Sequence, residues 1–132
     1  MPSDIAFIDP ETVAPPIGAY SHLAVVPPGA RLLVVAGQVG CDRAGDVPED
    51  IRDQYRLALQ NVVDILRSQG AGPQHLIHLR TFLTERVDLA GVRETRVAIL
   101  GAARPPATLL YVAGLADPKY KVEVEAMAAL PE

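Results

Sequence analysis

Leu32-Leu33-Val34-Val35-Ala36 and Leu109-Leu110-Tyr111-Val112-Ala113 are the two stretches that decide the fold of this chain. Alternate side chains of a β-strand point to opposite faces of its sheet, and in both stretches both sets are apolar. Continuous apolar strands are typical of sheets that are covered on both faces. We therefore expect one sheet with a layer of structure on each side.

Periodic segments with strand and helix patterns surround these two stretches. A hairpin is predicted first, with residues 21–26 and 31–38 as strands and Pro27-Pro28-Gly29 as the turn. Further strands are predicted over residues 76–84, 108–113 and 121–129. With two helices between them, the order predicts an α/β (α+β) fold: a single domain over residues 1–132 with a mixed sheet and both helices on one face.

The stronger helix pattern covers residues 48–69, with Asp46 as the predicted N-cap and Gly70 as the stop. Its apolar residues recur every three or four positions on one face, at Ile51, Tyr55, Leu59, Val62, Val63 and Leu66. A shorter helix is predicted over residues 88–100, ending at Gly101. Its predicted inward residues are Leu89, Val92, Ile99 and Leu100.

Two helices can cover only one face of the predicted sheet, so we expect an obligate partner subunit on the other. In the closing strand, Val122, Val124 and Ala126 share one face, and Glu123 and Glu125 point to the opposite one. One interpretation of these glutamates is a solvated strand face. The other is that they have a partner or a chemical task at the subunit contact.

The amino-acid composition argues against two classes of function, nucleic-acid binding and membrane insertion. Twelve basic against sixteen acidic residues give a net charge of −4, and the chain has no Trp, two Phe and four Tyr. Nucleic-acid binders usually carry a basic face or aromatic stacking platforms, so no nucleic-acid partner is expected. The chain shows no apolar run for a membrane span and no signal-peptide pattern, so we expect a cytoplasmic protein.

No metal or organic cofactor is expected either. The three histidines, His22, His75 and His78, are scattered and lack companions at ligand spacing. Cys41 has no nearby histidine to activate it. The glycines of residues 68–72 follow a helix pattern and do not open one, so they do not predict a phosphate cradle.

Five short motifs carry a resemblance to a known family. In chain order they are Pro16-Ile17-Gly18-Ala19-Tyr20-Ser21, Gly37-Gln38-Val39 with a loop to Gly45, Gln54 with Leu57 to Val62, Thr81-Phe82-Leu83, and Val122-Glu123-Val124-Glu125-Ala126. The chain resembles the YjgF/Rid family of reactive intermediate deaminases over nearly its whole length.

The resemblance implies a homotrimeric, chorismate-mutase-like barrel with small-molecule pockets between subunits. It also implies hydrolysis of reactive enamines and imines to ketoacids and ammonia. Tyr20 and Glu123 would be the catalytic residues. Gly37 and Gln38 would lie at the substrate, with the Gly37 N–H contacting it.

The chain departs from the family pattern at several pocket positions. The family's Pro-Ala-Arg arginine, which grips a substrate carboxylate, is replaced by Ala107 if the alignment starts at Pro105 and by Thr108 if it starts at Pro106. Ala36 stands where a hydroxyl residue is expected, and Arg93 where the family has asparagine. Arg93 is either a relocated cation that grips an anion or an exposed arginine on a polar helix face.

Three functions remain open from the sequence. The leading hypothesis is a Rid-type hydrolase with an altered substrate range. A non-catalytic metabolite-binding trimer is the main alternative. A ribonuclease, a label that some relatives carry, fits an acidic chain least well.

The first prediction is that the protein is a homotrimer in solution. Light scattering at micromolar concentration should give three times the 14.1 kDa mass of one chain. The apolar sheet face that two helices leave uncovered predicts association, and the family resemblance implies three subunits. A stable monomer would contradict the predicted architecture.

Overall fold

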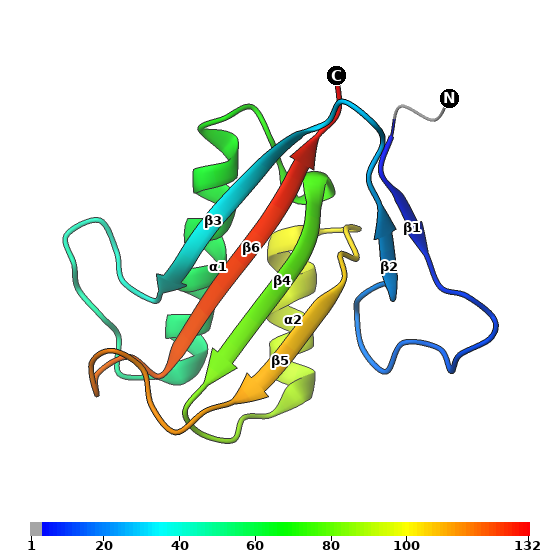
Figure 1. Cartoon of the computed structure of the whole chain (residues 1–132). Helices are drawn as coiled ribbons and strands as arrows, with labels where there is room; N and C mark the ends of the chain where they lie inside the picture. Colours follow the sequence, from blue (N-terminus) through cyan, green and yellow to red (C-terminus); the bar gives the residue numbers. More distant parts are fainter. Residues whose placement is uncertain (1–3) are drawn as a thin grey trace.

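The computed structural model describes residues 4–132 and contains six strands, two α-helices and one 3₁₀ turn (Figure 1). In chain order these are β1 (Ala6–Ile8), β2 (Leu23–Val25), β3 (Arg31–Val39), α1 (Ile51–Arg67), η1 (Pro73–His75), β4 (Leu76–Leu83), α2 (Leu89–Leu100), β5 (Ala107–Tyr111) and β6 (Val122–Leu130). Within residues 4–132, neither helix has the length and apolar character needed to cross a membrane.

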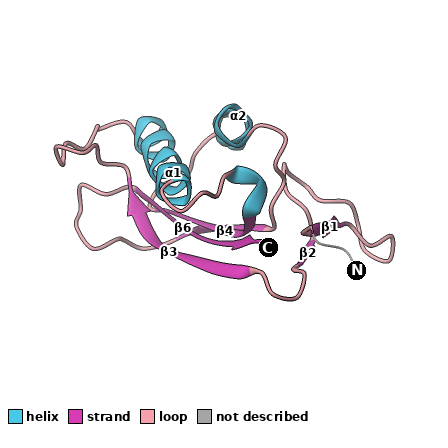
Figure 2. Ribbon diagram, turned by 90° about the horizontal axis from the view of Figure 1, so that it is seen from above, coloured by secondary structure: helices cyan, strands magenta, loops and turns pink. Residues whose placement is uncertain are grey.

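The main sheet has four strands in the order β3-β6-β4-β5. β4 and β5 run parallel, and β6 pairs antiparallel with both β3 and β4, so the sheet is mixed. Both helices pack on the same face (Figure 2). The predicted α+β architecture, with a mixed sheet and its helices on one side, is confirmed.

The predicted hairpin of residues 21–26 and 31–38 is wrong. β2 pairs with β1 in a separate two-stranded sheet, in which Ala6 lies opposite Val25, whereas β3 pairs with β6. The turn at Pro27 does form, since the Ala30 N–H donates to the Pro27 carbonyl at 3.4 Å. It moves the chain from one sheet to the other because three-residue β2 offers few ladder bonds and nine-residue β6 offers many.

The core lies between α1 and the sheet. The residues of α1 that face it, with at most 3% of their surface exposed, include Tyr55, Ala58, Leu59, Val62, Val63 and Leu66. On the sheet side, Val122 and Val124 are fully buried and Ala126 is 4% exposed. The apolar spacing of the helix therefore predicted the packing face correctly.

Three details of the helices differ from the prediction or refine it. Asp50, and not Asp46, caps α1, because its carboxylate accepts the Arg52 N–H at 2.7 Å. Asp88 caps α2, accepting the Ala90 N–H at 3.1 Å. Leu89, predicted to point inward, is 58% exposed in the subunit, since it lies in the first turn beyond the edge of the core.

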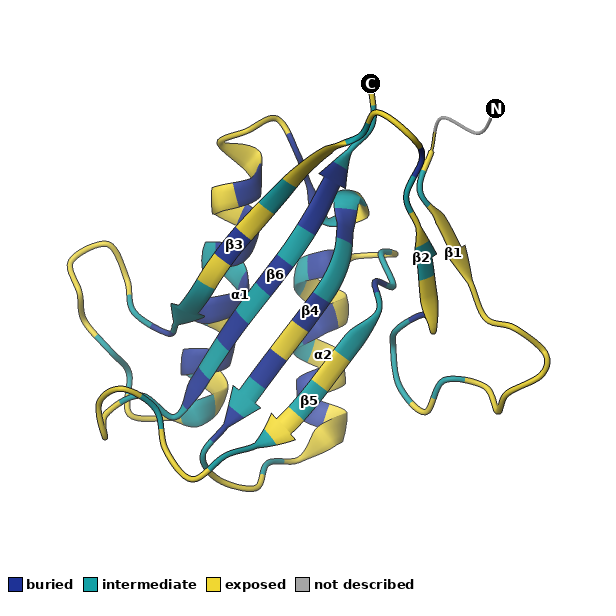
Figure 3. Ribbon diagram, in the orientation of Figure 1, coloured by how far each residue is buried: buried dark blue, intermediate teal, exposed yellow. Residues whose placement is uncertain are grey.

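The face of the sheet opposite the helices has no cover from residues 4–132 (Figures 2 and 3). Leu32, Val34 and Leu110 on this face are 56%, 75% and 46% exposed. Glu123 and Glu125 alternate with the buried valines of β6 and so point to the same open face. An apolar sheet face in water favours association with another molecule. The apolar strands of the sequence led to the same expectation of a partner subunit on this face.

Candidate functional site

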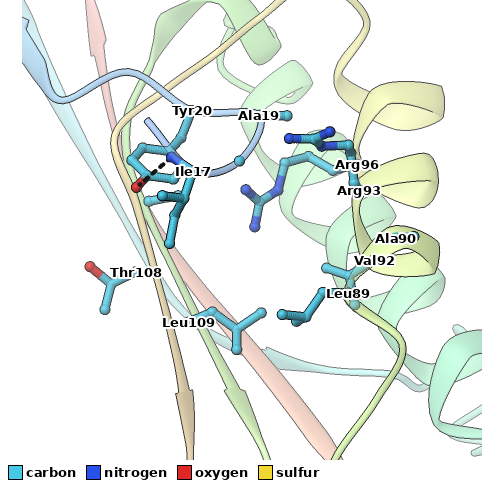
Figure 4. A pocket seen from close by; sticks show the side chains of 12 residues that line it. Ile17, Ala19, Tyr20, Leu89, Ala90, Val92, Arg93, Arg96, Thr108 and Leu109 are labelled. Carbon is cyan, nitrogen blue, oxygen red and sulfur yellow. Dashed lines mark hydrogen bonds between the residues drawn. The ribbon is translucent and has the colours of Figure 1, made fainter. Parts of the chain in front are cut away.

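A pocket of about 540 Å³ lies beside the edge strand β5, between a loop near the N-terminus and α2 (Figure 4). The loop of residues 17–20 forms one wall, α2 the opposite wall, and the start of β5 the floor. The lining residues are Ile17, Gly18, Ala19, Tyr20, Leu89, Ala90, Val92, Arg93, Arg96, Ala107, Thr108 and Leu109.

Tyr20 is held by contacts within its own loop. Its hydroxyl oxygen accepts the Ile17 N–H at 3.4 Å, and its ring lies edge-on to His22 with 6.0 Å between ring centroids. The oxygen acts only as an acceptor in that bond, so the O–H proton is free to be donated to a bound molecule. Tyr20 therefore offers its O–H as a hydrogen-bond donor in the pocket wall.

Two arginines extend from α2 toward the loop of residues 17–20 (Figure 4). Arg93 and Arg96 are three residues apart, which places them on the same side of a helix. Residues 4–132 contain two ion pairs, Arg56–Asp53 and Arg80–Glu125, and neither involves these arginines. The pocket wall thus carries two guanidinium groups with no carboxylate of the same subunit paired to them.

Arg96 is the more constrained of the two. It is 7% exposed, and its Nε is buried without a hydrogen-bond partner among the described residues. Arg93 is exposed at the pocket. Sequence reasoning identified Arg93 through its position in the family pattern and missed Arg96. The three-residue spacing from Arg93 was the signal that could have found it.

Ala107 and Thr108 both line the pocket, but they lie on different faces of β5. Ala107, with Leu109 and Tyr111, packs against the core on the helix side. Thr108 alternates with these residues and belongs to the open face of the sheet, as does Leu110. Only Thr108 therefore shares a sheet face with Glu123.

A second group of predicted residues meets at a β-bulge in β3. Val35 lies opposite Ala126 and Gln38 opposite Val124, so Ala36 and Gly37 together face the single residue Glu125. A bulge leaves one residue without its ladder partner, and its backbone groups are then available to other molecules. The Gln38 amide donates to the Ala36 carbonyl at 3.0 Å and so braces the bulge.

Glu123 lies directly over Gly37. A Cβ added to Gly37 would come within 2.7 Å of the Glu123 Cδ, which is closer than real side chains approach. Only glycine leaves room for the carboxylate at this position. The bulge and the glutamate therefore form one polar site on the open face of the sheet.

The structure brings together Tyr20, Arg93, Ala107 and Thr108 in the pocket, and Gly37, Gln38 and Glu123 at the bulge. Glu123 is not among the residues that line the pocket of its own subunit. Among residues 4–132, no cluster of three or more His, Cys, Asp or Glu side chains could hold a metal ion.

The sequence of this chain matches a known protein family. The profile of the family described as Endoribonuclease L-PSP matches residues 11–130. The chain belongs to this family, which is also called the YjgF/Rid family.

Individual relatives agree with this membership. A RutC family protein of Pyrococcus horikoshii is 31% identical over 121 residues, which is 89% of this chain and 92% of that protein. TdcF of Escherichia coli, which carries the name of a reactive intermediate deaminase, is 32% identical over 102 residues, or 74% of this chain and 78% of TdcF.

Solved structures show the same fold. A Rid family protein of unknown function, YyfB from Yersinia pestis, superposes with a TM-score of 0.86 at 28% identity, covering 96% of this chain and 99% of that one. The crystal structure of E. coli TdcF with bound serine superposes with a TM-score of 0.67 at 29% identity, covering 93% and 97% of the two chains.

The close approach of Glu123 to Gly37 generates a prediction. Gly37→Ala should destabilise the protein by about 1 kcal/mol, the low end for overpacking, because the new methyl group displaces the movable end of the Glu123 side chain and no backbone atom. Urea unfolding measures the change. Gly114→Ala is the matched control, since nothing lies within 4 Å of its Cβ position and its φ is not in the left-handed region.

A double variant tests whether contact with Glu123 causes the loss of stability in Gly37→Ala. If Glu123 is the clashing group, Gly37→Ala combined with Glu123→Ala should recover most of the stability that Gly37→Ala loses. Equal losses with and without Glu123 would contradict the assignment.

Proposed function

We propose that this protein is a Rid-type hydrolase that converts a small imine or enamine into a ketoacid and ammonia, in a pocket completed by a second subunit. The observation that carries the proposal is the pocket of Figure 4. It combines a free tyrosine O–H, two arginines without a carboxylate partner, and apolar walls. Such a pocket suits a small anionic metabolite.

Subunit association would join the pocket of one subunit to the polar site that Glu123 and the Gly37 bulge form on another. The open sheet face exposes apolar side chains that call for cover, and Glu123 and the Gly37 bulge lie on that face. In the proposed homotrimer, the loop carrying Tyr20 from one subunit lies against the bulge and Glu123 of its neighbour. Tyr20 and Glu123 would then flank one ligand, which they do not do within a single subunit.

The chemistry needs only these groups and water. Arg93 pairs with the substrate carboxylate and fixes the C=N carbon in place. The Glu123 carboxylate accepts a proton from water as the water oxygen attacks that carbon, and the proton passes to the nitrogen. The remaining O–H proton then passes through Glu123 to the nitrogen, the C–N bond breaks with its electron pair on nitrogen, the oxygen forms the C=O of the ketoacid, and ammonia leaves. Tyr20 and the Gly37 N–H donate hydrogen bonds to the centre where charge changes.

A non-catalytic metabolite-binding trimer is the second candidate. It is favoured by the absence of the family's strand arginine, since both Ala107 and Thr108 lack a charge, and by Ala36 in place of a hydroxyl residue. In this case the same pocket would hold a small acid without turning it over. A polynucleotide substrate, which the family's description suggests, fits poorly with a net charge of −4.

Neutralising Glu123 distinguishes the two candidates. Glu123→Gln should lower imine hydrolysis about 10²- to 10⁴-fold, the usual contribution of a general base, while the fold and the oligomer mass stay unchanged. Ketoacid and ammonia release over a panel of freshly generated imines is the measurement, with circular dichroism as the control for folding. Wild-type protein that hydrolyses none of the panel would favour the binder.

Replacing the missing strand arginine is a test of the site's geometry. Thr108→Arg should raise activity on small monocarboxylate imines about ten- to a hundredfold, because a charged hydrogen bond contributes about 1.5–3 kcal/mol. Thr108 lines the pocket and is exposed, so the new guanidinium would have room beside the ligand.

Ala107→Arg is the comparison variant. Ala107 also lines the pocket but packs against the core, so an arginine there would be crowded and should give a smaller gain. If Ala107→Arg restores activity and Thr108→Arg does not, the alignment from Pro105 is correct and the assignment of faces to the site is wrong.

A further inference from the structure

We propose that Arg93 and Arg96 form a paired anion site that selects ligands with two carboxylates, so that the preferred substrate is the imine or enamine of a dicarboxylic ketoacid. The choice of substrate rests on the proposed function. The preference for two carboxylates stands on the pocket alone and holds for a binder as well.

The burial of Arg96 is the first step. Arg96 as a whole residue is 7% exposed, and its Nε is buried without a hydrogen-bond partner, so the side chain has lost much of its water and gained no counterion from residues 4–132. Buried charges in proteins are normally paired, since an unpaired one is strongly destabilising. Arg96 lines the pocket, so a ligand anion placed there would supply the missing partner.

The second step is the pairing of Arg96 with Arg93. Both line the pocket from one face of α2, and like charges at this spacing repel each other. Each guanidinium can hold one carboxylate through two parallel hydrogen bonds. A monocarboxylate would satisfy one arginine and leave the other unpaired, whereas a dicarboxylate satisfies both.

The two arginines have different positions and so different roles. Arg93 is exposed at the pocket and holds the carboxylate next to the C=N group, as in the proposed mechanism. Arg96 is buried, against the loop wall beside Ala19, and holds the distal carboxylate (Figure 4). The apolar side chains of Leu89, Val92 and Leu109 line the same pocket, below the two arginines in Figure 4, and would contact the carbon atoms of the ligand.

The charges of a dicarboxylic imine also balance those of the completed site. A protonated imine of a dicarboxylic acid carries one positive and two negative charges. The two arginines match the carboxylates, and Glu123 of a neighbouring subunit matches the iminium nitrogen. Each charge of the ligand then has one opposite charge in the site.

Binding of two five-carbon ketoacids tests this inference. 2-Oxoglutarate and 2-oxopentanoate have the same chain length and differ in the terminal carboxylate. Isothermal titration of the wild-type oligomer should show 2-oxoglutarate binding about ten- to a hundredfold more tightly, as expected for one charged contact. Equal affinities, or no binding of either acid, would overturn the proposal.

Single variants assign the two roles. Arg96→Gln should remove the preference by weakening 2-oxoglutarate alone, and Arg96→Lys should retain part of it. Arg93→Gln should weaken both acids. Arg67→Gln is the control, because it removes an equal charge from the exposed last turn of α1 and should change neither affinity.

The remaining outcomes separate this inference from the proposed function. If Arg96→Gln splits the oligomer and leaves the ratio of affinities unchanged, Arg96 pairs with a neighbouring subunit and the inference is wrong. A clear preference for 2-oxoglutarate without hydrolysis of any imine would refute the proposed hydrolase and support the inference. Hydrolysis of imines with equal affinities for the two acids would support the proposed hydrolase and refute the inference.

Discussion

The alternation of side chains along β6 is the constraint on which the rest of this structure depends. Val122 and Val124 have no exposed surface and pack against α1, so the strand cannot shift by one residue without burying charges. The same alternation turns Glu123 and Glu125 to the open face. Hydrophobic packing on one side of the sheet therefore positions the carboxylates on the other.

The open face uses these carboxylates in two different ways. Glu125 forms an ion pair with Arg80 at 2.6 Å, with the two side chains 32% and 50% exposed. Glu123 has no such partner among residues 4–132 and lies over the backbone of Gly37 instead. One glutamate thus has an electrostatic partner and the other remains available for chemistry. A bulge that only glycine fits and an unpaired carboxylate are the features expected of a site completed by another molecule.

The pocket arginines show how a binding site can change while its fold is kept. The strand that carries the family's arginine has small, uncharged residues here, and the cations come from the facing helix. An arginine from a helix approaches the ligand from a different wall. Moving the cation therefore changes which end of a ligand is gripped, and a second cation changes how many anionic groups can be held. Under the proposed function, two residues of one helix would alter ligand selectivity without any change of architecture.

By itself, the sequence predicted β2 to β6, both helices and most of their buried faces, because apolar periodicity reports burial directly. It missed β1 and placed the exposed Leu89 inward. It also determined the family, since five motifs occur in one order, and from the family it predicted Tyr20, Glu123, Gly37 and Arg93 as site residues. Tertiary structure alone decided that β3 pairs with distant β6, because ladder length outweighs nearness in the chain. It decided that Ala107 and Thr108 face opposite ways, since the motif fits two alignments but a strand has one register. It also brought Arg96 into the pocket, because the burial of a long polar side chain depends on what packs around it, and no local pattern records that.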